Sequence, residues 1–192
     1  MPLRLSANTV LEALDRADSR HWTRTPPLSA RARLAYLLRH HHHDTAALAH
    51  RLEASPADLD ALRTAGQIPQ DHPLHQAVER EVIRLWQPRI RRRAHDTILA
   101  NGGQMMLSFR AWLGFTAASG SSDDPRLRFL TLSLTAPYPE RLFTAQRTGA
   151  SETELRAILG DALGACYFYR DRPAHPKEKT VLERIDFLEF YY

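Results

Sequence analysis

Five arginines fall within ten residues near the middle of the chain, and no acidic residue lies among them: Arg84, Arg89, Arg91, Arg92 and Arg93. This composition is expected of a segment that lies along phosphate groups, and Trp86 and Ile90 give it an apolar edge. If all five arginines met duplex phosphates, the logarithm of affinity would fall against the logarithm of salt with a slope of about −4.5. The alternative is an arginine-rich helix end that only faces solvent.

Four consecutive histidines, His40 to His43, raise the question of a metal site. Adjacent residues of a helix point about 100 degrees apart, so the four rings cannot all face one ion. Cys166 is the only cysteine, which excludes an intramolecular disulfide and a cysteine-based zinc cage. We therefore interpret the histidines as a solvated linker and expect no metal site and no intrinsic cofactor.

Length and composition fit a globular protein of one domain or two small ones, with 192 residues of which 43% are hydrophobic. The chain has no run of eighteen apolar residues, and Met1-Pro-Leu-Arg-Leu-Ser6 lacks the order of a signal peptide. These features predict a cytoplasmic protein without membrane contact. The net charge of +4 lies in residues 1–100, with 15 arginines against 11 acidic residues, so we expect a polyanionic partner to meet this half.

The first half has the pattern of several short helices. Apolar residues near helical spacing predict an amphipathic helix within residues 3–20, and the prolines of Thr25-Pro-Pro-Leu28 break it. Ser29 is placed to cap a second helix that runs to His40. Residues 44–63 have the spacing of a helix-turn-helix, with Ser55-Pro56 opening its second helix. An ordinary helical hairpin has the same pattern.

Two details of this segment argue against strong base reading. Glu53 stands where the turn usually has glycine, and a positive φ at a non-glycine residue costs on the order of 1 kcal/mol. The second helix exposes Asp58 and Asp60 and offers only Arg63 as a cation. Acidic groups there repel phosphates unless they accept hydrogen bonds from cytosine amino groups.

The second half changes its periodicity after Asn101-Gly102-Gly103. A long helix from about Leu74 precedes this point, and Pro88 should kink or end that helix. Residues 104–115 and 126–135 read as strands, 138–146 and the stretch opened by Ser151-Glu-Thr-Glu154 as helices, and 181–192 as a final strand. The predicted fold is α+β, with an N-terminal helical arm (1–28), a helix-turn-helix (29–66), a basic connecting helix (67–100) and a small antiparallel-sheet domain (101–192).

Several short motifs occur in the order found in one known family. With the helix-turn-helix, the chain shares with it Glu79-Arg-Glu81 leading to Trp86-Gln-Pro-Arg89, Phe109-Arg-Ala-Trp-Leu-Gly-Phe-Thr-Ala117, Ser122-Asp-Asp-Pro-Arg-Leu-Arg128, Arg141-Leu-Phe-Thr-Ala-Gln146 and Tyr167-Phe168. Over roughly residues 29–192 the chain resembles the telomere-protecting terminal proteins (Tpg type) of linear actinomycete chromosomes and plasmids. It departs from them where the recognition helix should be basic.

The resemblance implies a protein linked covalently to the 5′ ends of linear replicons, in the nucleoid. In such proteins a side-chain hydroxyl replaces the 3′-OH of an RNA primer, and a DNA polymerase transfers the first deoxynucleotide to it, with divalent metal ions supplied at the polymerase active site. The implied partners are telomeric DNA, the polymerase and a telomere-binding recruitment protein. The chain would then be a primer and substrate, not a conventional enzyme.

An acceptor hydroxyl must protrude into a polymerase cleft, which favours a loop over a packed strand. The hydroxyl-rich stretch after Phe115 offers Thr116, Ser119, Ser121 and Ser122. Thr116 matches a family threonine and is our first choice, with Ser121 and Ser122 next and Tyr138, Tyr191 and Tyr192 as remote alternatives. An ordinary Gly-Ser hairpin connection without a priming role would have the same composition. The competing function is a non-priming helix-turn-helix regulator with a C-terminal dimerisation domain.

Overall fold

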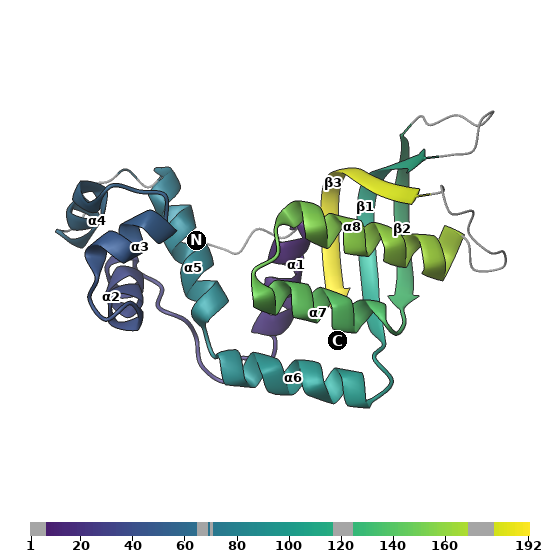
Figure 1. The fold of residues 1–192 in the computed structure, drawn as a ribbon, viewed down its shortest axis with the longest axis horizontal. Coiled ribbons are helices and arrows are strands. Elements are labelled where there is room, and N and C mark those ends of the chain that lie inside the picture. Colours follow the sequence, from purple (N-terminus) through teal and green to yellow (C-terminus); the bar gives the residue numbers. More distant parts are fainter. Residues whose placement is uncertain (1–6, 65–68, 70, 117–124, 169–178) are drawn as a thin grey trace. The chain divides into compact units, whose positions relative to one another are not determined.

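The computed structural model describes residues 7–64, 69, 71–116, 125–168 and 179–192. These residues form eight α-helices, one π-helical turn and a three-stranded antiparallel sheet, which confirms the predicted α+β class (Figure 1). The chain divides into two compact units, residues 22–90 and residues 1–21 with 91–192. The first helix therefore shares a unit with the sheet, a grouping that differs from the four consecutive segments expected from the sequence.

The helical unit (residues 22–90) contains α2 (Ala30–His40), α3 (Thr45–Arg51), α4 (Pro56–Arg63) and α5 (Pro73–Leu85). Side chains of Ser29, Asp44 and Ser55 accept hydrogen bonds from the first turns of α2, α3 and α4, as N-caps do. The core of this unit is aliphatic, and its fully buried members include Leu34, Leu37, Leu48, Leu59 and Val78.

The connecting segment is divided into two helices at Pro88, where the sequence predicted a kink or an end. α5 ends at Leu85, and α6 (Pro88–Ala100) begins two residues after Trp86. Proline cannot continue a helix but suits its first position, so Pro88 ends one helix and opens the next. Gln87 in the break has a positive φ of 45°.

The sheet unit is built on β1 (Met105–Thr116), β2 (Arg126–Leu134) and β3 (Lys179–Tyr191) in the order β2-β1-β3. All neighbours are antiparallel, with Phe109 opposite Leu130 on one side and Leu188 on the other. Side chains alternate between the two faces of a strand, so the buried series of β1 is Met105, Leu107, Phe109, Ala111 and Leu113. These side chains point toward the helices.

Three helices cover that buried face: α1 (Val10–Ser19), α7 (Tyr138–Thr148) and α8 (Glu152–Leu163) (Figure 1). The predicted capping box at Ser151 and Glu154 is present, and the π-helical turn Gly164–Phe168 follows α8. α1 is fastened to α8 because the carboxylate of Glu152 accepts hydrogen bonds from the backbone N–H groups of Val10 and Leu11. The strand, strand, helix, helix, strand order predicted for this half is confirmed.

Candidate nucleic-acid interface

The turn between α3 and α4 contains a residue in the left-handed region of the backbone map. Leu52 caps α3, and Glu53 adopts a φ of 53°, the left-handed region that the sequence predicted for this position. Ser55 then caps α4 in a reciprocal capping box with Asp58. Leu48 and Ala49 of α3 are buried in the same core as Leu59 of α4. The two helices are thus held as a packed pair by local chemistry.

The exposed face of α4 has a net negative charge, with two aspartates against one arginine. Asp58 is occupied as a cap, since its carboxylate accepts hydrogen bonds from the hydroxyl and the N–H of Ser55, and these bonds lower its pKa. Arg63, predicted to contact DNA, lies 3.0 Å from Asp60, and both side chains are exposed. Asp60 weakens the attraction of Arg63 for a phosphate, so α4 is a poor phosphate-binding element by itself.

Arg84 is engaged inside the helical unit. Its Nε and a terminal nitrogen lie 2.8 and 2.6 Å from the two carboxylate oxygens of Glu81, and Arg51 of α3 approaches the same carboxylate. Glu81 is 6% exposed. Burial would raise the pKa of Glu81, but hydrogen bonds from Arg84 and Arg51 outweigh burial and lower it. The principal role of Arg84 is therefore to neutralise a buried acid.

Arg91 does not suit a phosphate contact either, which corrects its assignment to the DNA-binding set. Its side chain is 7% exposed and its Nε lies 3.0 Å from Asp18, with Asp15 at 3.5 Å. A guanidinium that is buried against two carboxylates within its own unit cannot reach a polyanion without breaking those pairs. We therefore remove Arg91 from the candidate interface.

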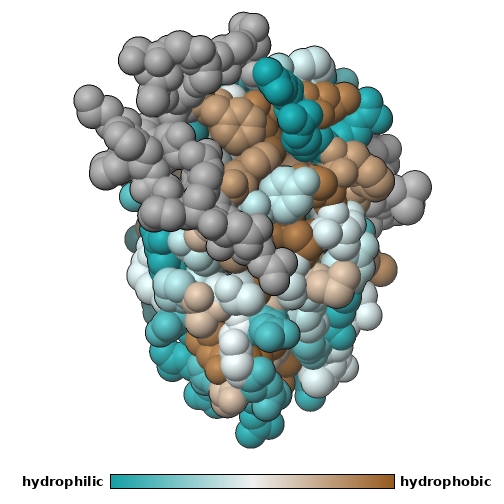
Figure 2. All heavy atoms as spheres, turned by 90° about the vertical axis from the view of Figure 1, so that its right-hand side faces the viewer, coloured by the Kyte–Doolittle hydropathy of each residue, from teal (hydrophilic) through white to brown (hydrophobic). Residues whose placement is uncertain are grey.

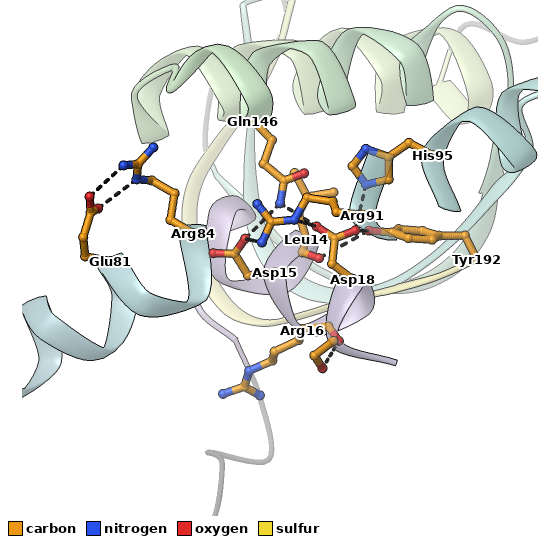
Figure 3. Close-up of polar contacts among 11 residues, drawn as sticks. Leu14, Asp15, Arg16, Asp18, Glu81, Arg84, Arg91, His95, Gln146 and Tyr192 are labelled. Atoms are coloured by element: carbon orange, nitrogen blue, oxygen red, sulfur yellow. Dashed lines mark hydrogen bonds and ion pairs between the residues drawn. The ribbon is translucent and has the colours of Figure 1, made fainter. Parts of the chain in front are cut away.

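Asp18 is the centre of the network that holds Arg91 (Figure 3). One of its carboxylate oxygens accepts hydrogen bonds from His95 Nε2 at 2.7 Å and from the Tyr192 hydroxyl at 2.8 Å. The other lies 2.9 Å from Gln146 Nε2 and 3.0 Å from Arg91 Nε. The carboxylate thus accepts three hydrogen bonds and forms an ion pair with Arg91. The network joins α1 to α6, α7 and the residue that follows β3.

Burial shapes the electrostatics of this network. Desolvation raises the pKa of Asp15 to about 6, against the opposing influence of Arg91 and Gln146. Burial, and after it the charge of Asp18, raises the pKa of Tyr192 well above its usual range. The imidazole of His95 is completely buried and stacks on Phe143 with ring centroids 3.7 Å apart. The cluster is thus a buried polar core in which His95 Nδ1 and Gln146 Oε1 have no hydrogen-bond partner among the described residues. Its carboxyl Asp15 titrates near pH 6.

The other arginines of α6 lie on its exposed side. Helical geometry places residues 89, 92 and 93 within one arc, on the opposite side from residues 91 and 95. Arg89, Arg92 and Arg93 are exposed, whereas Arg91 and His95 are buried. Asp96 lies within the same exposed arc and reduces its charge. The predicted basic segment is therefore a row of three arginines on one helix face.

The acceptor hydroxyls fall at or beyond the end of β1. Thr116 is the last residue of that strand, and its backbone pairs with Lys179 of β3. Ser119, Ser121 and Ser122 lie outside the described residues. Among the tyrosine alternatives, Tyr192 is disfavoured because its hydroxyl donates to Asp18 in the protein interior, whereas Tyr191 is 41% exposed.

The histidine run ends α2 and turns the chain toward α3. His41 caps the helix, and His42 and His43 have positive φ angles of 53° and 64°. No cluster of three or more histidine, cysteine, aspartate or glutamate side chains with metal-binding geometry occurs within the described part of the chain. In the same residues no helix combines the length and apolarity of a membrane span.

Sequence reasoning missed the residues that surround Arg91, although a signal for them was present. Val10, Leu14 and Ala17 mark the buried side of α1, and Asp18 follows Leu14 at a spacing of four. On α6, Arg91 and His95 have that same spacing. A charged residue on the apolar side of each of two helices is the sequence pattern of a buried ion pair. The partners, however, are 73 and 77 positions apart, which no local pattern can connect.

Comparison with known proteins gives this chain no relative. No family model matches it, and neither a curated protein nor a solved structure is similar to it at a significant level.

Proposed function

We propose that this chain is a DNA-binding terminal protein that becomes linked through a threonine or serine hydroxyl to the 5′ ends of linear replicons. It serves there as protein primer and end cap, working with telomeric DNA, a DNA polymerase and a telomere-binding recruitment protein. The observation that carries the DNA-binding part is the row of Arg89, Arg92 and Arg93 on the exposed side of α6. The priming part rests on the family resemblance of the sequence motifs.

The charges of α4 and α6 support different contributions of these two helices to DNA contact. The α3–α4 pair, interpreted as a helix-turn-helix, offers duplex DNA only Arg63, which Asp60 partly neutralises. The α6 row provides guanidinium groups suited to phosphate oxygens. Three such contacts predict a slope of about −2.7 for log affinity against log salt, smaller than expected for five. This arrangement favours sequence-independent binding, consistent with recruitment to the replicon end by a partner.

The priming step transfers a nucleotide to the chain. The hydroxyl oxygen of the acceptor attacks the α-phosphorus of a deoxynucleoside triphosphate, a new P–O bond forms and pyrophosphate leaves. The hydroxyl proton passes to a base or to water in the polymerase site, where divalent metal ions belong to the polymerase. Thr116 is the preferred acceptor because it matches a family threonine in the Gly-Phe-Thr-Ala context, although it is the last residue of β1 and pairs with Lys179 where a loop was expected.

The alternative function is a non-priming regulator that binds DNA through α3 and α4. It is favoured by the positive-φ turn at Glu53 and by the side-chain caps of α3 and α4, which hold these two helices as a pair. The two functions differ in one measurable respect. Only the primer acquires a covalent nucleotide.

The decisive experiment incubates the purified full chain with the replicon's DNA polymerase, a terminal template and labelled deoxynucleoside triphosphates. Label that stays on the protein after denaturation, and is released by alkali as phosphate esters of serine and threonine are, supports priming. Thr116→Val should abolish it, whereas Ser121→Ala, Ser122→Ala and the exposed control Thr144→Val should retain it. Absence of label, while the same polymerase extends a conventional primer, would leave the regulator as the better interpretation.

A further inference from the structure

Large hydrophobic side chains gather on the face of the sheet that α1, α7 and α8 leave open. Seven large hydrophobic residues are exposed within the described parts of the chain, and five of them lie on this face: Met106, Leu127, Phe129, Val181 and Tyr191. Phe129 is the most prominent, with 70% of its surface exposed. Monomeric proteins rarely display such a set on one surface without a use for it.

The strand register establishes that these side chains share a face. Met106 pairs with Tyr191, and Leu127 pairs with Trp112. Arg110 lies between Phe129 and Phe187, whose ring centroids are 6.4 Å apart. Directly opposed residues of antiparallel strands project from the same face. Figure 2 shows hydrophobic atoms gathered at the surface of this unit among hydrophilic ones. We call the surface formed by Met106, Leu127, Phe129, Val181 and Tyr191 the open sheet face.

The charges of the open sheet face are paired with one another. Arg110 and Arg184 both approach Asp186, at 3.5 and 3.0 Å, and Arg184 also lies over the ring of Trp112. At the edge, Arg20 forms an ion pair with Glu189. Two acids of the same face lie beside these three arginines and offset most of their charge, so the face presents no strong positive field to a polyanion. Its exposed aromatic rings instead suit an apolar protein surface.

We propose that the open sheet face is a homodimer interface, in which a second copy of this chain packs against the first about a two-fold axis. A two-fold contact places one patch against itself, so the patch must be self-complementary. The open sheet face meets this condition because its arginines lie beside acids, and either sign can face the other across the axis. The apolar side chains around Phe129 then bury one another.

The size of the face sets the expected affinity. Nine residues of β2 extend about 30 Å and three strands span about 14 Å, which gives a plane of about 400 Å² in each copy. Two such planes fall at the low end of specific interfaces, where association is weak and transient. We therefore expect a dimer that forms at micromolar concentrations and dissociates on dilution.

The test is sedimentation velocity of the full chain without DNA over a series of concentrations. The wild type should shift from monomer to dimer in the micromolar range. Phe129→Glu places an unpaired charge in the apolar centre of the contact, and it should raise the dissociation constant about tenfold or more. Val181→Lys, on another strand of the face, should have the same effect. The control is Leu28→Glu, since Leu28 is 75% exposed but lies in the helical unit.

Circular dichroism and thermal unfolding should show that each variant retains the wild-type fold. A wild type that stays monomeric throughout, or a dimer that Phe129→Glu leaves intact, would overturn the proposal. Binding of a single-stranded oligonucleotide by a monomeric chain, lost in Phe129→Glu, would overturn it in favour of a nucleic-acid platform. Because no DNA or polymerase is present in the sedimentation experiment, its outcome is independent of the priming assay.

Discussion

His95 Nε2 lies 2.7 Å from Asp18 Oδ1, and both side chains are completely buried. Asp18 also accepts hydrogen bonds from Gln146 and Tyr192 and pairs with Arg91. An unpaired buried carboxylate would be strongly destabilising, but this one has three hydrogen bonds and an ion pair, which connect several elements to α1. The sheet unit therefore depends on polar contacts as well as on its apolar core.

Replacing Asp18 by asparagine should destabilise the fold by about 3–5 kcal/mol, because Arg91 loses its charged partner and an amide NH₂ faces other donors. The free energy of unfolding from urea titration measures this. The control is Asp161→Asn, whose ion pair with Arg141 is also 3.0 Å long but exposed. That change should cost less than about 1 kcal/mol. Equal losses in the two variants would contradict the structural role of Asp18.

Stability should fall as pH rises from about 4 to above 6 through the contribution of Asp15. Burial raises the pKa of Asp15 from 3.8 to about 6 in the folded protein. The folded state therefore binds the proton more tightly than the unfolded state, and the resulting stabilisation is lost as pH rises through the folded pKa. The shift corresponds to about 3 kcal/mol at most.

The check for Asp15 is urea unfolding of the wild type and of Asp15→Asn between pH 4 and 7. The variant should gain stability relative to the wild type as pH rises, since it lacks the titrating group. The groups that face Asp15 are Arg91, Gln146, Asp18 and Glu12, and all remain in both proteins. Parallel pH profiles would mean that Asp15 does not titrate in this range.

Removing two exposed arginines of α6 should flatten the salt dependence of duplex binding. Each phosphate contact contributes about 0.9 to the slope of log affinity against log salt, so Arg92→Ala with Arg93→Ala should reduce it by about 1.8. Fluorescence anisotropy with a labelled duplex at several salt concentrations provides the measurement. Arg147→Ala removes an exposed arginine from α7 and should leave the slope unchanged. An unaltered slope in the double variant would reject the α6 row as the phosphate contact.

Replacing Glu53 by glycine should raise the thermal midpoint of the helical unit. Glycine adopts the positive φ of this turn without strain, which gains up to about 1 kcal/mol after the entropy of the unfolded chain is counted. Differential scanning calorimetry detects such a gain. The matched change Glu140→Gly, inside the first turn of α7, should lower stability by about 1 kcal/mol instead. A drop in both variants would show that Glu53 has a role beyond its backbone conformation.

The comparison of Arg91 with its neighbours shows the limit of sequence reasoning. Three consecutive arginines look alike as a basic cluster, but helical geometry points Arg91 away from Arg92 and Arg93. Only the tertiary structure shows that Arg91 forms ion pairs with Asp18 and Asp15 of α1. The same applies to Glu81, whose burial depends on Arg51, thirty residues earlier in the chain.

Elements whose chemistry is local could be predicted from the amino-acid sequence. Ser29, Ser55 and Ser151 mark helix starts because their hydroxyls bond N–H groups within the next turn, and β2 alternates because a strand has a period of two. The covered face of each element, the burial of particular charges and the solvent exposure of particular aromatic rings depend on the tertiary structure. Those outcomes depend on pairs of residues far apart in sequence, such as Asp18 with His95 and Phe129 with Phe187, and they exist only once the chain has folded.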